Sequence, residues 1–184
     1  LNIIRAAFTT GDSPFKYIPA YNVSLFLSAN AADVRQANAE GYAAGQVLAS
    51  TSEDSEEDEE LRISFDFDGV IADDSAEYVY QKAGIDRFYE AEKARAAIPH
   101  SPGPLADLFA KLAKLRDLED ERAKHEPGYK RHIKTAIVTA RSAPAHERVV
   151  TTLRAWNINV DQTFFLGGMD KGRILAILKP HIFF

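Results

Sequence analysis

The stretch FDFDGVIADD, residues 65–74, places two carboxylates two positions apart at the end of an apolar segment. In an extended chain, residues i and i+2 point to the same side, so Asp66 and Asp68 converge on one spot. Gly69 follows them directly and allows the backbone to turn sharply. Because the helix-forming sequence DDSAEYVYQKAG comes next, the pattern predicts a buried strand, a tight loop and then a helix.

A β-hairpin is the alternative structure for the same stretch. Asp-Gly is a strong two-residue turn signal, and residues 70–72 could form the returning strand. However, the two phenylalanines and the Val-Ile pair around the carboxylates make the stretch too apolar for an exposed hairpin. We therefore favour the strand, loop and helix.

The rest of the chain alternates short apolar runs with helical stretches. The apolar runs, several of them continuous rather than alternating, cover residues 3–8, 23–29, 46–49, 62–67, 134–140, 162–166 and 181–184. The helical stretches cover residues 31–40, 75–83, 104–124, 144–156 and 172–178. Strands that alternate with helices predict an α/β fold with a mainly parallel, Rossmann-like sheet, which binds ligands at the carboxyl ends of its strands.

Composition and charge narrow the class of protein. The 184 residues are 46% hydrophobic, which is enough for a sizeable core, and 27 acidic against 22 basic residues argue against a nucleic-acid partner. The absence of cysteine excludes disulfides, thiolate catalysis and Cys-ligated zinc. No apolar run approaches the roughly 18 residues of a membrane span, and no secretory signal opens the chain. We therefore expect a cytoplasmic protein without a membrane partner.

The ends of the chain and one charged run suggest the domain organisation. Both ends lie inside apolar runs, from which we expect a fragment of a longer protein. The acidic residues 51–60 cannot bury themselves and predict a solvated linker. This linker separates an N-terminal α/β segment, residues 1–50, which we expect to be continuous with the core, from the main unit.

Two further loops carry candidate anion-binding residues. KTAIVTARSAPAHERV, from Lys134, runs a strand into Thr139 and then a helix, with Ser142 near the N-cap position and Pro144 in the first turn. LGGMDKGRIL repeats this scheme, with Lys171 at the start of a helix. Free N–H groups and the macrodipole favour a phosphate at a helix N-terminus. Taken alone, Thr139 could simply end a strand and Lys171 could be solvated, but both loops should open on the same edge as Asp66.

The two carboxylates define the chemistry expected at this edge. Held together they repel each other, so either a proton or a shared cation must resolve the conflict. Mg²⁺ prefers carboxylate, water and phosphate oxygens. Such a site leaves one carboxylate free to attack phosphorus and the other able to hold a transferable proton.

The order of these motifs resembles the haloacid dehalogenase superfamily of phosphotransferases. More closely, FDFDGVIADD, IVTARSAPAHERV, FFLGGMDKG and KPHIFF resemble the cytosolic 5′-nucleotidase type I family. This resemblance implies Mg²⁺-dependent hydrolysis of nucleoside 5′-monophosphates of the AMP, IMP or dNMP type. Asp66 would be the nucleophile that forms an aspartyl-phosphate, and Asp68 would protonate the leaving oxygen and then activate water.

The resemblance also implies the binding groups of the site. Thr139, Ala140 and Lys171 would bind the phosphoryl oxygens, and Mg²⁺ would bind the Asp66 carboxylate and the Asp68 backbone carbonyl. The family places further metal-binding aspartates after the strand that corresponds to HIFF, so we expect the chain to be truncated before them.

A helical cap is the remaining feature that the resemblance implies, over residues 75–133, between the two parts of the catalytic core, residues 61–74 and 134–184. Near its entrance, Asp74 and Glu77 could contact substrate or metal, or could be acids favoured by a helix N-terminus. Phe88 and Tyr89 could stack on a nucleobase or belong to the core. A phosphatase for another small ester, a non-catalytic nucleotide-binding module and a homo-oligomer all stay open as alternatives.

Overall fold

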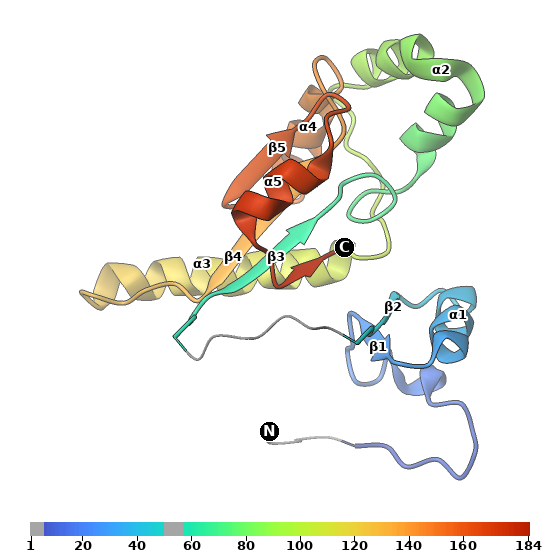
Figure 1. The fold of residues 1–184 in the computed structure, drawn as a ribbon, viewed down its shortest axis with the longest axis vertical. Coiled ribbons are helices and arrows are strands. Elements are labelled where there is room, and N and C mark those ends of the chain that lie inside the picture. Colours follow the sequence, from blue (N-terminus) through green and yellow to red (C-terminus); the bar gives the residue numbers. More distant parts are fainter. Residues whose placement is uncertain (1–5, 50–56) are drawn as a thin grey trace. The chain divides into compact units, whose positions relative to one another are not determined.

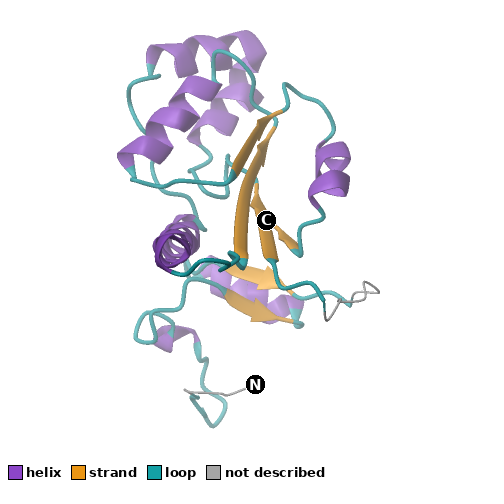
Figure 2. Cartoon of the chain, turned by 90° about the vertical axis from the view of Figure 1, so that its left-hand side faces the viewer, coloured by secondary structure: helices purple, strands orange, loops and turns teal. Residues whose placement is uncertain are grey.

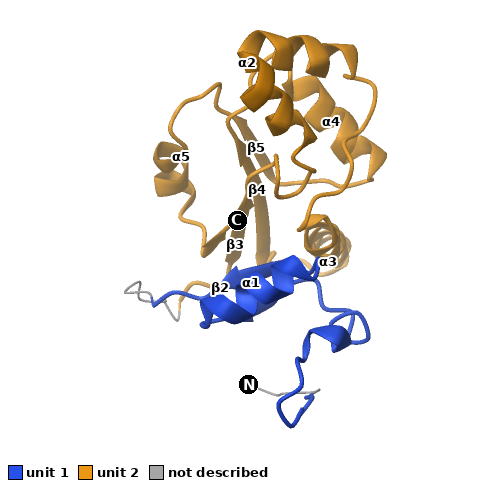
Figure 3. Ribbon diagram, turned by 90° about the vertical axis from the view of Figure 1, so that its right-hand side faces the viewer, with its two compact units in different colours: residues 1–52 blue, residues 53–184 orange. Residues whose placement is uncertain are grey.

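The computed structural model describes residues 6–49 and 57–184, and the chain forms two compact units, residues 1–52 and 53–184 (Figure 3). Each unit is described by itself. The predicted linker, residues 51–60, falls largely outside the described residues. The same holds for residues 3–5 of the first apolar run, and its last three residues have no regular secondary structure.

The N-terminal unit contains a small parallel sheet. Its elements are a 3₁₀ turn at Phe15–Tyr17, β1 at Phe26–Ser28, α1 at Ala31–Ala39 and β2 at Ala44–Gln46. β1 pairs with β2 in parallel, and α1 connects them. The Asn30 side chain caps α1 by accepting a hydrogen bond of 2.9 Å from the Ala32 N–H. That this segment continues the core stays a prediction.

The second unit is built on a four-stranded parallel sheet in the order β5-β4-β3-β6 (Figure 1). Its strands are β3 at Leu61–Phe65, β4 at Ile133–Thr139, β5 at Gln162–Phe165 and β6 at Ile182–Phe183. Its helices are α2 at Ser75–Ala94, α3 at Ala106–His125, α4 at His146–Ala155 and α5 at Lys171–Leu178. All three strand pairs are parallel, which confirms the predicted α/β class and Rossmann-like sheet.

The strand order places the loop after β3 at a topological switch point. The chain adds β4 and β5 on one side of β3 and then returns to its other side with β6. Helices therefore cover both sides of the sheet (Figure 2), with α5 on one face and α3 and α4 on the other (Figure 3). In such sheets ligands bind beyond the carboxyl ends of the strands where the order reverses. Asp66 follows β3 at this position.

The core of this unit lies between the sheet and α3. Phe65, Ile137 and Val138 are fully buried, and the Phe109 ring of α3 packs edge-on against Phe65 with 5.0 Å between ring centroids. Leu112 of α3 is buried as well. Thus α3, which lies inside the segment expected to form a cap, packs on the sheet, and α2 is the part of that segment that remains a candidate cap.

α2 is longer than the sequence pattern predicts. The expected helix ends before Gly84, whereas the observed helix continues to Ala94 across a kink at Gly84, where φ is +80°. Glycine adopts this left-handed conformation without the steric cost of a Cβ. The second half of the helix is held because Phe88 and Glu92 are buried.

The N-terminus of α4 differs from the prediction as well. The helix begins at His146 with Ala145 as its N-cap, and no side chain caps it, so the prediction of Ser142 near the N-cap is wrong. Instead, the Ser142 and Tyr89 hydroxyls share a hydrogen bond of 2.8 Å. Within the part of the chain that is described, none of the helices has the length and apolar character that crossing a membrane requires.

Candidate active site

Asp66 occupies the carboxyl end of β3. Its backbone N–H donates to the Phe184 carbonyl at 2.7 Å, which extends the pairing between β3 and β6 by one residue. Its carboxylate Oδ1 accepts a 2.7 Å hydrogen bond from the Phe67 N–H, and Oδ2 contacts Lys171 Nζ. Because Phe67 is fully buried, the carboxylate is oriented by backbone that the core holds in place.

The loop after Asp66 turns back on itself and leads into α2. Gly69 has φ of +72°, and the Ala72 N–H donates to the Phe67 carbonyl at 2.9 Å. The Leu105 N–H also donates to Val70, at 2.9 Å, which fixes the loop to the start of α3. Residues 70–72 do not form a returning strand, so the structure confirms the predicted strand, loop and helix.

Thr139 ends β4 beside this loop. Its hydroxyl accepts a hydrogen bond of 3.3 Å from the Arg141 N–H, and its carbonyl accepts one of 2.9 Å from Leu166. The Gly168 N–H donates to the Ala140 carbonyl at 3.0 Å. These backbone bonds join the loops after β4 and β5, so that both open on the carboxyl edge of the sheet, as the sequence predicts.

Lys171 is the first residue of α5. Asp170 caps this helix by accepting a 2.8 Å hydrogen bond from the Gly172 N–H, which fixes the first turn. The Lys171 ammonium forms an ion pair with Asp66, and the two side chains are 26% and 29% exposed. From the sequence alone, a solvated Lys171 was an alternative. In the structure, its ammonium group contacts the Asp66 carboxylate instead.

Asp68 is held by a residue that the sequence reasoning did not select. Arg141 donates to both of its carboxylate oxygens, from Nε at 2.7 Å and from a terminal nitrogen at 2.6 Å. The Arg141 side chain is 2% exposed and that of Asp68 is 18% exposed. Such a two-bond pair fixes the plane of the carboxylate as well as its position.

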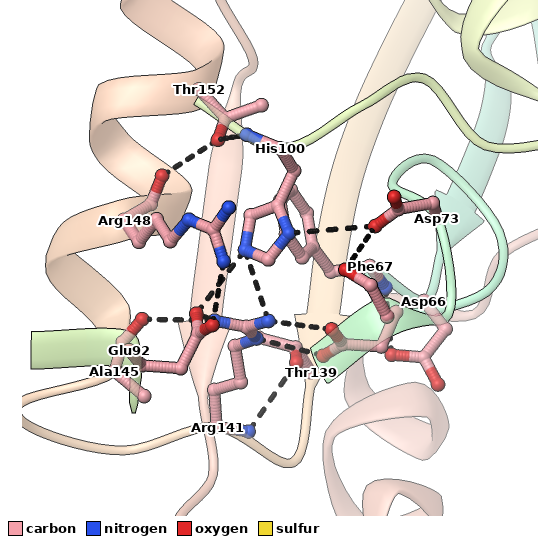
Figure 4. A network of polar contacts seen from close by, with 12 residues as sticks. Asp66, Phe67, Asp73, Glu92, His100, Thr139, Arg141, Ala145, Arg148 and Thr152 are labelled. Carbon is pink, nitrogen blue, oxygen red and sulfur yellow. Dashed lines mark hydrogen bonds and ion pairs between the residues drawn. The ribbon is translucent and has the colours of Figure 1, made fainter. Parts of the chain in front are cut away.

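A buried polar network continues from Arg141 into α2 and α4 (Figure 4). Glu92 of α2 contacts Arg141 through Oε2, accepts a 2.7 Å bond from Arg148 through Oε1, and lies 3.2 Å from Nε2 of His100. The backbone N–H of His100 donates to the Thr152 hydroxyl at 2.9 Å. All five of these residues are buried, so the charges can be accommodated only because they are paired.

This pairing controls the protonation of Glu92. Burial alone would raise the pKa of the carboxyl group, but hydrogen bonds from His100, Arg141 and Arg148 and the charge of Arg141 outweigh burial and lower the pKa from 4.5 to about 2. Glu92 therefore stays ionised at neutral pH.

The lowered pKa makes the stability of the fold depend on pH. A folded-state pKa below the unfolded value contributes stability above the unfolded pKa, and that stability is lost as the pH falls through the folded pKa. We expect this contribution to fall by about 2 kcal/mol between pH 6 and pH 3 in wild type and to be missing in Glu92→Gln. The free energy of unfolding, measured with urea at both pH values, checks the difference between the two proteins.

Glu90→Gln is the matched control for this experiment. Glu90 lies on the exposed side of the same helix, 66% exposed and paired with Arg87. Its replacement should change stability by less than about 0.5 kcal/mol at either pH. Parallel pH curves for wild type and Glu92→Gln would contradict the assignment of a strongly paired Glu92.

A pocket of about 520 Å³ opens above the sheet edge. Its lining residues are Asp66, Asp68, Glu77, Tyr80, Ile85, Phe88, Tyr89, Thr139, Ala140, Arg141, Gly167 and Gly168. The structure thus brings most of the predicted site residues together, with Lys171 joined through its contact with Asp66. Asp74 is the exception, since it lines a separate pocket with Asp73 and Pro102.

The side chains at this site could supply only some of the ligands of a divalent cation. Among residues 6–49 and 57–184, no group of three or more His, Cys, Asp or Glu side chains could hold a metal ion. Asp66 and Asp68 remain as two acids that line the pocket. The pair fits Mg²⁺, which commonly binds one or two carboxylates and completes its shell with water and substrate phosphate.

Several pocket and network residues were not predicted. Arg141 directly follows the selected Thr139 and Ala140, so its place in the motif was a usable signal. No sequence signal pointed to Glu92, because an acid on a helix usually faces solvent. Ile85 lines the pocket because α2 continues past its kink at Gly84, whereas Tyr80 lies in the part of the helix that the sequence predicts.

Fold and site together define a Rossmann-like α/β protein of the haloacid dehalogenase type, with two aspartates, a threonine and a lysine gathered at the carboxyl edge of the sheet. Comparison with known families is consistent with this class: the family described as 5′-nucleotidase matches residues 1–184, so the chain belongs to the 5′-nucleotidase family. This match confirms the resemblance seen in the motifs.

A curated relative supports the same family. Cytosolic 5′-nucleotidase 1B of Homo sapiens is 34% identical to the chain over 189 aligned residues, which cover 100% of the chain and 30% of that protein. The chain thus spans about 30% of the length of this relative. No solved structure matches the chain significantly.

Proposed function

We propose that the chain carries the active site of a 5′-nucleotidase that hydrolyses nucleoside 5′-monophosphates with Mg²⁺. The observation that carries this proposal is the contact of Asp66 with Lys171 at a pocket lined by Asp68 and Thr139. A carboxylate nucleophile next to a cation, with a second acid nearby, is the equipment that hydrolysis of a phosphate monoester requires. The family assignment supports the same reaction.

The first half of the reaction transfers the phosphoryl group to the protein. An oxygen of Asp66 attacks phosphorus, the bond to the nucleoside oxygen breaks, and Asp68 donates a proton to that leaving oxygen. Lys171, the Thr139 hydroxyl and the backbone of Ala140 bind the phosphoryl oxygens. Their fixed positions favour the charge of the transition state because they need no reorganisation during the reaction.

The second half restores Asp66. Asp68, now ionised, takes a proton from water, and the resulting hydroxide attacks phosphorus so that Asp66 leaves as a carboxylate and inorganic phosphate is released. The Asp66 carboxylate and the Asp68 backbone carbonyl would hold Mg²⁺, which neutralises phosphoryl charge when bound. Each proton that Asp68 donates in the first step is thus recovered in the second.

The aromatic wall of the pocket supports a nucleoside as the leaving group. Phe88 and Tyr89 of α2 pack edge to face with 5.6 Å between their ring centroids, and Tyr80 packs on Phe88 at 6.3 Å. All three line the pocket, and Phe88 is buried behind the more exposed Tyr80, so a base could stack on Tyr80 while its phosphate reaches Asp66. Glu77 lines the same pocket and could accept a hydrogen bond from a ribose hydroxyl. We assign no substrate contact to Asp74.

Phosphate release from a substrate panel tests the proposal. The full-length protein with Mg²⁺ should hydrolyse AMP, IMP and deoxynucleotides faster than ribose 5-phosphate or glycerol phosphate. Tyr80 is 45% exposed at this wall, so Tyr80→Leu should raise KM for the nucleotides about 10-fold, since stacking on one base contributes about 1–3 kcal/mol. The substitution should leave KM for ribose 5-phosphate unchanged.

The other outcomes of this panel would change the assignment. A preference for a sugar phosphate would replace the substrate but keep the chemistry. Tight nucleotide binding without phosphate release would favour a non-catalytic binding module. Since the human relative is described as cytosolic, we also propose a cytoplasmic location for this chain.

A further inference from the structure

Four of the five N–H groups of Arg141 donate to protein oxygens. Two of them bind the carboxylate of Asp68, and two others donate to Glu92 and, at 3.1 Å, to the Ala145 carbonyl. The fifth faces the His100 ring nitrogen Nε2 at 3.1 Å. With four donors bound to protein oxygens and the fifth turned toward a buried ring, this guanidinium has no donor directed at a substrate phosphate.

The surroundings of Arg141 fix it in this orientation. Its guanidinium carbon lies 5.3 Å from the centroid of the Phe67 ring and 5.3 Å from that of the Phe88 ring. The side chain is 2% exposed. Stacking against aromatic rings adds to the hydrogen bonds and restricts the planar group to one position.

We propose that Arg141 is a positioning residue that presents Asp68 to the leaving group, and that Glu92 acts on Asp68 through Arg141. This inference rests on the proposed function, in which Asp68 transfers the proton. The two bonds from Arg141 occupy one lone-pair direction on each Asp68 oxygen and leave the others available. Asp68 lines the pocket and is 18% exposed, so a remaining lone pair can meet a substrate oxygen there.

Glu92 makes this arrangement depend on α2. It binds Arg141 with one oxygen and Arg148 of α4 with the other, so that its single negative charge lies between two buried guanidinium groups. The same helix carries Phe88 and Tyr89, which line the pocket. The position of the pocket wall and the orientation of Asp68 are therefore coupled through one carboxylate.

Two conservative substitutions test the positioning role. Arg141→Lys keeps the charge but cannot bind both oxygens of Asp68 and Glu92 together, and Glu92→Asp keeps the charge but is one methylene shorter. We expect each to lower kcat for AMP hydrolysis about 10- to 100-fold while KM changes less than about threefold, because a misplaced group affects the transition state more than ground-state binding.

Arg148→Lys is the matched control. Arg148 binds the same carboxylate and the Ile98 carbonyl, but it does not contact Asp68. This variant should show a lowered midpoint in urea and a kcat within about twofold of wild type. If Arg148→Lys lost as much kcat as Glu92→Asp, the cluster would be merely structural and the proposal would be wrong. A raised KM with normal kcat in Arg141→Lys would overturn it too, since Arg141 would then bind substrate.

A measurement without turnover separates this proposal from the proposed function. Hydrogen exchange of the Arg141 Nε–H, followed by NMR, should be slow in wild type and faster in Asp68→Asn and Glu92→Asp, because the bond to Asp68 protects it. Fast exchange in wild type would overturn the positioning role even if hydrolysis were normal. Slow exchange in a protein that releases no phosphate would support the contact and overturn only the proposed reaction.

Discussion

Asp66→Asn is expected to lower kcat for nucleoside monophosphate hydrolysis by more than about 1,000-fold, because a carboxamide cannot attack phosphorus as a carboxylate does. The substitution also disturbs the contacts of the side chain. Oδ1 of Asp66 accepts from the Phe67 N–H, and Oδ2 contacts Lys171. In either orientation of the amide, its NH₂ group faces another donor, so the site loses one attractive contact.

The measurement is steady-state phosphate release at saturating nucleotide, with the unfolding midpoint in urea determined for the same samples. Asp66 is 29% exposed and lies at the end of a strand, so the variant should fold and unfold close to wild type. Nucleotide binding, measured by calorimetry, should weaken far less than turnover. Retention of more than a tenth of the wild-type kcat would show that Asp66 is not the nucleophile and would remove the basis of the proposed mechanism.

The fold was predictable because its signals are local. Continuous apolar runs mark β3, β4 and β5, and the predicted helices overlap all five observed helices among the described residues. The alternation of these elements is sufficient to predict a parallel sheet. The carboxyl-edge placement of Asp66 and Thr139 follows from the same pattern, because each comes at the end of a strand.

The predicted element bounds are wrong where tertiary contacts determine the secondary structure. β2 was expected over residues 46–49, but the strand is Ala44–Gln46, and Val47 and Leu48 after it are 52% and 72% exposed. Pairing with β1 selects the register here rather than hydrophobicity. Likewise, the second half of α2 depends on the burial of Phe88 and Glu92, which no local signal after Gly84 indicates.

The site residues likewise form two groups, one that sequence motifs predict and one that only the folded chain brings together. Residues at strand ends and at a helix start were selected from short motifs, and the structure places them around one pocket or in contact with it. Their roles stay predictions. Arg141 lies 49 residues from Glu92 and 41 residues from His100 along the chain, so the members of this network cannot be recognised from spacing. A buried ion pair becomes visible only once the fold has brought its partners together.

Lys171→Met tests the cation of the site and should lower kcat about 100- to 1,000-fold, the effect of removing one group that stabilises transition-state charge. Methionine is nearly as good a helix former as lysine, and Asp170 can still cap α5 through Gly172, so the fold should persist. Without the ammonium, the Asp66 carboxylate also repels an incoming phosphate. KM for AMP should therefore rise together with the fall in kcat.

Product inhibition separates a phosphate ligand from a simple ion-pair partner of Asp66. If Lys171 binds phosphoryl oxygens, inorganic phosphate should inhibit wild type competitively and Lys171→Met at least about 10-fold more weakly, as expected for one lost charge-assisted bond of about 1.5–3 kcal/mol. Arg173→Met removes an exposed cation two residues further along α5 and should change both kcat and inhibition less than about twofold. Unchanged phosphate inhibition in Lys171→Met would mean that the lysine serves only to hold Asp66, and that the phosphoryl oxygens depend on Thr139, Ala140 and the metal instead.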